Sequence, residues 1–224
     1  MTDHASSSSA SRWSPSRLFG VATERRTYRH LAYLLLRFPL GIAAFVVFVT
    51  GISLGVALLI LLVGLPLLVG VLGLADHAGV VEAELATRLL GRDVSWDPID
   101  PTDLPLTEYA RAVATDPRAY LLLVWFFASF FVGIAAFVGV VTVFATALVL
   151  AIAPLVYWLP SVQYAIADGA GGPLGTYAID TLPEALVASV VGVALVILGL
   201  HAVNLAARGL GAVVEALLTP PQNR

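Results

Sequence analysis

Residues 31–74 form an apolar run of 44 residues in which Arg37 is the single charge. A bilayer core needs roughly 20 apolar residues per helix, so the run is long enough for two spans and too apolar for one soluble helix. The small and hydroxylated residues Thr50, Gly51, Ser53 and Gly55 permit a sharp reversal. The run therefore predicts a helical hairpin, with spans over about 31–50 and 54–75.

Arg37 lies within two turns of the start of the first predicted span. From there its long stem can carry the guanidinium out to the lipid headgroups. The alternative is a functional charge inside the membrane, because charges deep in lipid usually serve a function.

The composition is that of an integral membrane protein. Of 224 residues, 59% are hydrophobic and 12% charged, and the mean hydropathy is +0.91. Soluble domains have about one quarter charged residues. Cysteine is absent, which excludes disulfides and thiolate metal sites. All twelve basic residues are arginine, a bias that suits a halophile or a high-GC genome and says little about function.

Arginine placement predicts how the chain is threaded through the bilayer. Residues 1–26 are rich in Ser and Arg and predict a disordered cytoplasmic tail, because arginines precede the first span. The loop over 76–118 carries four arginines and is expected inside, whereas the loop over 159–182 carries none and is expected outside. One span must then lie between them, with 144–158 either a kinked extension of it or an interfacial segment. The last span covers about 184–206, so both termini are cytoplasmic in a multi-pass protein of the cell membrane.

Two amphipathic segments are predicted at the inner surface. Over 79–91, Val81, Leu85 and Leu89 recur every four residues, with charged residues on other faces. A second segment at 209–218 has Val213, Val214, Leu217 and Glu215. Between the halves, residues 93–117 are acidic and proline-rich and predict a solvated, extended cytoplasmic linker.

The chain contains an internal repeat at a constant offset of 92. The hexapeptide at 41–46 recurs at 133–138, with flanking matches over 28–53 and 120–145. We expect repeat 1 over 27–92 and repeat 2 over 118–219, parallel because both start inside. The fold class is therefore an all-α membrane protein with four transmembrane helices in two parallel repeats, each followed by a cytoplasmic amphipathic helix. The small residues Gly41, Ala44, Gly133 and Ala136 are expected to pack the two halves together; the alternative is a ligand groove between them.

The outer loop offers the candidate ligand site. Its glycine density predicts turns or a short hairpin lid. If a ligand is sensed there, we expect it to contact Gln163, Tyr164, Asp168, Tyr177 and Asp180; the alternative is an ordinary loop. Thr181 and Glu184 have the spacing of a capping box that starts the last helix.

Motifs of catalysis are not found in the sequence. The four histidines show no metal-ligand spacing, and His30 and His77 are expected to contact headgroups. Without lysine a phosphate-binding P-loop is excluded, and no nucleophile elbow or paired intramembrane carboxylates occur. We therefore expect no enzyme, cofactor or metal, and no nucleic-acid partner, since no helix carries a basic stripe.

Several segments resemble a known family. They are the stretch TYRHLAYLLLRFPLG at 27–41, VGLPLL at 63–68, RLLG at 88–91 and IDTLPEAL at 179–186. Together they resemble the "putative sensor" domain found in front of bacterial and haloarchaeal histidine kinases, over about 27–218. The resemblance implies a four-span module that perceives an unidentified stimulus, with no catalytic residues to transfer. No kinase segment follows in this sequence, so we expect output through a separate partner.

Two functions are thus weighed. The first is a sensory module that passes a stimulus to a separate kinase or regulator through small helix shifts, with the lipid bilayer and a possible second copy as further partners. The alternative is a small transporter or lipid-binding membrane protein. Transporters usually place polar or broken helices at midplane, and here Thr50, Ser53, Thr142 and Thr146 are the candidates. A purely structural scaffold is the third possibility.

Overall fold

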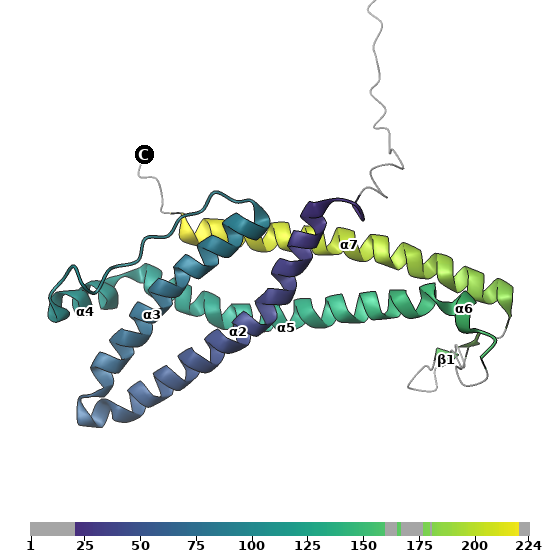
Figure 1. Ribbon diagram of the computed structural model, residues 1–224. Helices are drawn as coiled ribbons and strands as arrows, with labels where there is room; N and C mark the ends of the chain where they lie inside the picture. Colours follow the sequence, from purple (N-terminus) through teal and green to yellow (C-terminus); the bar gives the residue numbers. More distant parts are fainter. Residues whose placement is uncertain (1–20, 160–164, 167–176, 180, 220–224) are drawn as a thin grey trace, which may run out of the picture.

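The computed structural model describes residues 21–159, 165–166, 177–179 and 181–219. Most of the described chain is helical (Figure 1). The elements in order are α2 (Arg25–Ala57), η1 (Leu58–Leu61), α3 (Gly64–Leu85), η2 (Ala86–Leu90), α4 (Leu106–Thr115), α5 (Pro117–Ala151), α6 (Ala153–Val156), β1 (Ala165–Ile166), β2 (Tyr177–Ala178) and α7 (Leu182–Leu218). The two short strands pair antiparallel. Residues 1–20 of the predicted tail lie outside the described residues.

Four helices in the described part are long and apolar enough to cross a membrane. They cover Arg25–Leu61, Gly64–Leu90, Pro117–Ala151 and Leu182–Leu218. Large apolar side chains on all of them are exposed, as lipid-facing surfaces require. The protein is therefore a predominantly helical, multi-pass membrane protein, and the predicted number of spans agrees with the number of such helices in the described residues.

The first hairpin turns later than predicted. Helix α2 runs without interruption through 50–55 to Ala57, and the chain reverses over 58–63, where Leu62 adopts a left-handed conformation (φ 60°). The small residues serve packing instead. A Cβ atom on Gly51 would lie 2.6 Å from Val71 Cγ2 of the returning helix. The predicted reversal at 50–55 is therefore wrong, because its small residues let α3 approach α2 closely.

The amphipathic helix predicted over 79–91 is not a separate surface helix. Residues 79–90 continue α3 and η2 up to Gly91, whose positive φ of 65° ends the helix. Its buried face holds Glu82 and Ala83, whereas Val81 is 49% exposed. Leu85 and Leu89 of the predicted stripe pack against a core cluster, whereas Val81 faces away from the protein, so the stripe was only partly assigned to the right side.

The connector between the hairpins is also more ordered than an extended linker. Asp76 of α3 is 2% exposed and accepts hydrogen bonds from Trp96 Nε1 (3.0 Å) and the Ile99 amide (2.9 Å). Helix α4 then places Tyr109 and Val113 in a buried cluster with α3. Burial, and secondarily the nearby Asp76 carboxylate, raise the pKa of the Tyr109 hydroxyl. The acidic segment is thus anchored on α3 at the positions where its few apolar and aromatic residues occur.

The second hairpin consists of α5 and α7. Helix α5 extends through Ala151, and a separate short helix, α6, follows a break at Ile152. The region 144–158 is thus mostly an extension of the third span. A capping box opens α7, in which the Thr181 amide donates to Glu184 Oε2 (3.2 Å). The predicted amphipathic piece at 209–218 is continuous with α7, and its Val214 is buried in the main core cluster.

Helices α2 and α5 cross in opposite directions. Four ring pairs join them: Phe38 with Phe137, Phe45 with Phe130, Phe45 with Phe127 and Phe48 with Phe126, with centroid distances of 4.4, 4.2, 5.8 and 5.2 Å. As the residue number rises on α2, that of its partner falls on α5, so the two helices are antiparallel. The predicted parallel repeat is therefore wrong for this pair. Similar apolar faces can pack in either direction, and sequence identity between them does not specify which.

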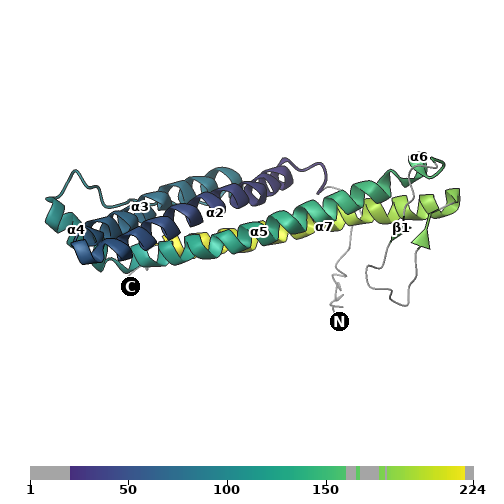
Figure 2. The same ribbon diagram turned by 90° about the horizontal axis from the view of Figure 1, so that it is seen from below.

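The hairpins consequently point away from each other. The turn of the α2–α3 hairpin and the α6 end of the α5–α7 hairpin lie at opposite ends of the molecule (Figure 1). Helices α5 and α7 pack together toward α6, where a Cβ on Gly192 would lie 2.6 Å from the Ala151 amide nitrogen, and they separate toward the other end (Figure 1). Seen from below, α2 and α3 lie beside the half of α5 that is farther from α6 (Figure 2). The crossing of α2 with α5 is where the two hairpins meet.

Close backbone contact at this crossing depends on two glycines. A Cβ on Gly41 would lie 3.0 Å from the Ser129 carbonyl oxygen, and one on Gly133 would lie 2.8 Å from that of Arg37. Ala44 and Ala136 are partly buried against the two neighbouring core clusters. The four small residues expected to pack the halves therefore all lie at or beside this contact.

Candidate functional site

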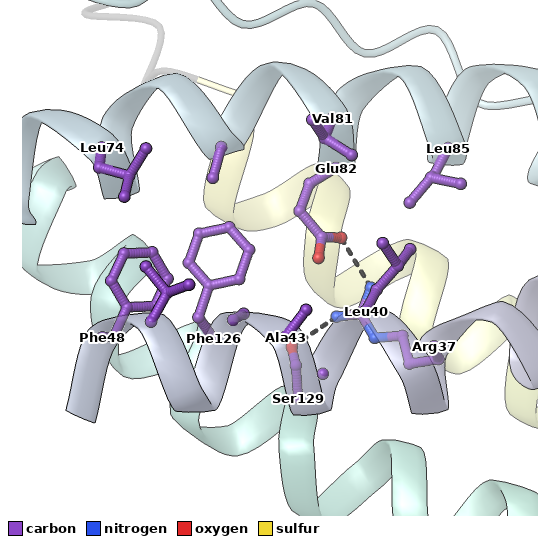
Figure 3. A pocket seen from close by; sticks show the side chains of 14 residues that line it. Arg37, Leu40, Ala43, Phe48, Leu74, Val81, Glu82, Leu85, Phe126 and Ser129 are labelled. Carbon is purple, nitrogen blue, oxygen red and sulfur yellow. Dashed lines mark hydrogen bonds and ion pairs between the residues drawn. The ribbon is translucent and has the colours of Figure 1, made fainter. Parts of the chain in front are cut away.

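Arg37 is buried where α2, α3 and α5 meet. Its side chain is 3% exposed. Arg37 Nη1 donates to Glu82 Oε2 of α3 at 2.6 Å, and Nη2 donates to Ser129 Oγ of α5 at 2.7 Å. Figure 3 shows both side chains converging on the guanidinium. The expectation that Arg37 extends to the headgroups is therefore wrong, because its guanidinium has an anionic partner inside the protein.

Aromatic residues complete the cage around this cation. Tyr33, one turn before Arg37 on α2, accepts a hydrogen bond from Nη1 (3.1 Å). Trp125, one turn before Ser129 on α5, places its ring 4.6 Å from the guanidinium carbon, within cation–π range. Residues four apart lie on the same face of a helix, so Tyr33 shares a face of α2 with Arg37 and Trp125 shares a face of α5 with Ser129. The guanidinium group lies between these two faces.

These four residues are related by the repeat offset. Tyr33 corresponds to Trp125 and Arg37 to Ser129 at an offset of 92. Glu82 comes from α3, within the first half of the chain. The first half thus supplies both ion-pair partners, and the second half supplies a neutral hydroxyl and an indole.

The cluster is costly to bury and incompletely satisfied. Each charge taken out of water carries a desolvation penalty of several kcal/mol, which a counter-charge with good geometry offsets. Two buried donors, Arg37 Nε and Trp125 Nε1, have no hydrogen-bond partner among the described residues. An unpaired buried donor costs about 1–3 kcal/mol, so the cluster is incompletely hydrogen-bonded by the described residues.

An apolar cavity of about 260 Å³ adjoins the cluster. Arg37, Glu82 and Ser129 lie at one end of it, and Phe48, Phe126 and Leu74 lie at the other (Figure 3). Its walls come from α2, α3 and α5. Leu40, Val47, Leu74 and Val81 line it and are also exposed, so the cavity opens toward the surface that faces lipid. The arrangement suits an apolar molecule with one small polar group.

A second polar contact joins the start of α2 to α7. His30 Nδ1 lies 2.6 Å from Asn204 Oδ1, and Asn204 Nδ2 donates to Thr27 Oγ1 (3.1 Å). His30 and Thr27 are each 1% exposed. The expectation that His30 contacts headgroups is wrong, since its ring is buried and hydrogen-bonded to a helix of the other hairpin.

The contacts of Arg37 and His30 do not involve the predicted outer ligand site. Gln163, Tyr164, Asp168 and Asp180 lie outside the described residues. Tyr177 is described as part of β2, where its backbone pairs with Ile166. The outer site therefore stays a prediction, and the Arg37 cluster is the buried ion pair with an adjoining cavity that the described part of the chain shows.

Comparisons with known proteins place most of the helical region in one family. A family model described as "Putative sensor" matches residues 33–218. This range begins at Tyr33 of the Arg37 cluster and ends with α7. The comparison with curated proteins gave no match, and the comparison with solved structures gave none either.

Proposed function

This chain belongs to the family described as "Putative sensor", and we propose that it is a membrane module that passes a stimulus to a separate cytoplasmic partner. The observation that carries this proposal beyond the family name is the buried Arg37 cluster. It joins helices of both hairpins at their crossing, and it lies beside a cavity that opens toward lipid.

The signal we propose is a change in how the two hairpins cross. Arg37 binds Glu82 within its own hairpin and Ser129 of the other hairpin, so a shift of α5 along α2 must break or exchange the latter bond. Close-packed interfaces of this kind prefer discrete arrangements to continuous sliding. A ligand that enters the cavity beside Arg37 would favour one arrangement over another.

A relationship between the two halves is supported by paired contacts. Phe38 stacks on Phe137, and Phe130 stacks on Phe45. Phe130 is the repeat counterpart of Phe38 at the offset of 92, and Phe45 is the counterpart of Phe137, so the two ring pairs are equivalent. The Tyr28 and Tyr120 hydroxyls likewise donate to the Ala22 and Ala114 carbonyls, respectively, at the same offset. We propose a pseudo-two-fold axis through the α2–α5 crossing, perpendicular to both helices.

We also propose that both termini are cytoplasmic. Arg25, Arg26 and Arg29 lie at the start of α2, and Arg208 of α7 lines the same cavity as Arg26. Positively charged residues at span ends favour the cytoplasmic side. The partner would then contact the exposed side chains of this end, such as Val213.

The experiment compares Glu82→Gln with Glu84→Gln in the cell that expresses the protein. Both changes remove one carboxylate from α3, but Glu82 is buried in the cluster and Glu84 is exposed in a pair with Arg88. Deletion of the gene should change the transcript profile, E84Q should restore it, and E82Q should not. An unchanged profile on deletion, or restoration by E82Q, would contradict the sensory role.

Transport is the competing function. Solute flux by the purified protein in proteoliposomes, lost in E82Q and kept in E84Q, would favour it. The cavity supports the sensory proposal better, because it is lined almost wholly by apolar side chains and no described polar path crosses the protein from it.

A further inference from the structure

Arginines from three separate segments converge around the start of α2 and the end of η2. A cavity of about 310 Å³ is lined by Arg26 of α2, Arg92 after η2 and Arg208 of α7. A second cavity, of about 710 Å³, is lined by Arg25, Arg26 and Arg29. Both cavities also have Leu90 and Gly91 in their walls, so they are neighbours around the end of η2. We call these five arginines the basic cluster.

The positive charge of the basic cluster is only partly neutralised by nearby carboxylates. Arg92 pairs with Glu215, while the other four arginines form no ion pair within the described residues. The exposed Glu24 precedes them at the start of α2. Five guanidinium groups against two carboxylates leave an excess of positive charge in a hollow, where the field of the charges adds up. Such a site favours an anion.

Guanidinium chemistry specifies the kind of anion. The guanidinium group of arginine is planar and always charged, and it can bind two oxygens of a phosphate group through two parallel hydrogen bonds. Arg26 and Arg208 are exposed and reach the same cavity from different hairpins, so one phosphate can be held from two sides.

The surroundings of the basic cluster indicate a phosphate that is attached to a lipid. Leu89 and Leu90 form an apolar floor next to the arginines. The exposed Tyr28 lies beside them in sequence, at the start of a helix long and apolar enough to cross a membrane, where aromatic residues mark the headgroup level. Basic pockets between membrane helices on the cytoplasmic side are the usual binding sites of anionic headgroups.

We infer that the basic cluster binds the headgroup phosphate of an anionic phospholipid, held between Arg26 of the first hairpin and Arg208 of the second. Occupancy of this site would hold α2 and α7 together beside the contact of His30 with Asn204. This inference is independent of the sensory proposal, since it concerns another part of the molecule and another ligand.

The test is native mass spectrometry of the full-length protein in a neutral detergent, with phosphatidylglycerol and phosphatidylcholine added at equal concentrations. The wild type should retain phosphatidylglycerol in clear preference. The double variant Arg26→Gln/Arg208→Gln should lose about thirtyfold in affinity for it, the effect of two arginines near a charged lipid. Both residues are exposed, so the fold should tolerate the change.

The matched control is Arg88→Gln/Arg111→Gln. It removes the same net charge from two exposed arginines that line neither cavity, and it should bind phosphatidylglycerol as the wild type does. Equal losses in both double variants would mean a general effect of net charge and would overturn the inference, as would no loss in R26Q/R208Q. Displacement of the lipid by millimolar inorganic phosphate, with the phosphate retained, would assign the site to free phosphate instead.

Discussion

Replacement of Glu82 by glutamine should destabilise the protein far more than the same change at Glu84. The Arg37–Glu82 pair is 2.6 Å long and almost fully buried. At an effective dielectric constant of about 20, charges this close attract by about 6 kcal/mol. Desolvation offsets part of this attraction, and removal of one partner from a buried pair costs about 3–5 kcal/mol.

For E82Q we expect a loss near 3 kcal/mol, the lower end of that range. The glutamine oxygen can still accept a hydrogen bond from Arg37, and Ser129 and Tyr33 keep theirs. Glu84→Gln, at an exposed surface pair, should change stability by less than about 0.5 kcal/mol. Reversible unfolding in mixed micelles, followed by tryptophan fluorescence, measures both; Trp125 lies against Arg37 and reports on the cluster directly.

A double variant separates the ion pair from general packing. Arg37→Met/Glu82→Met removes both charges and should be more stable than either single replacement, because no uncompensated charge stays buried. If E82Q costs no more than E84Q, or if the two methionine changes simply add, the ion pair does not stabilise the cluster and the reasoning fails.

Three further variants test the packing that surrounds this site. Gly133→Ala should destabilise by about 1–3 kcal/mol, since its methyl group would press on the backbone of α2, whereas Gly139→Ala, with open space around it, should be neutral in the same unfolding assay. Asn204→Leu should cost about 1–3 kcal/mol because buried His30 loses its partner, and hydrogen exchange should rise at the start of α2; unchanged exchange would contradict this. Asp76→Leu should release the connector from α3, so limited proteolysis should cut within 93–105 sooner than in the wild type, and an unchanged rate would show that the connector is held elsewhere.

Features set by local composition could be predicted from the sequence. Four helices of sufficient length follow from where apolar residues run uninterrupted, and a capping box opens α7 where the sequence places Thr181 and Glu184. The small residues at Gly41 and Gly133 also identified the contact between the halves. These properties depend on neighbouring residues alone, and so they can be read from short windows.

Features that depend on distant partners could not be predicted. Small residues at 50–55 allow either a turn or close packing, and the choice depends on Val71, which approaches only once the hairpin has formed. Glu82 looked like a solvent-facing charge, because its partner Arg37 is 45 positions away. The direction of the α2–α5 crossing is equally hidden, since an apolar face with glycine and phenylalanine can pack both ways.

A clue to the buried pair was nevertheless present. Arg37 is the single charge in a long apolar run, and a charge deep in lipid is usually paired or functional. Glu82 stands next to Val81 and Ala83 on the following helix, within reach of a hairpin partner. A lone charge on one arm of a predicted hairpin and an opposite charge on the continuation of the other arm are a signal to test for pairing.

The antiparallel crossing of α2 and α5 underlies the account of the site, and crosslinking tests it most directly. The chain has no cysteine, so introduced pairs are unambiguous. Phe48→Cys with Phe126→Cys should react with a short bis-methanethiosulfonate reagent in native membranes, because these rings are 5.2 Å apart. Phe48→Cys with Val140→Cys should not, since Val140 lies 14 residues further along α5, about 21 Å away. A parallel crossing in register would give the reverse result, with the pair at 48 and 140 linked and the pair at 48 and 126 unreactive.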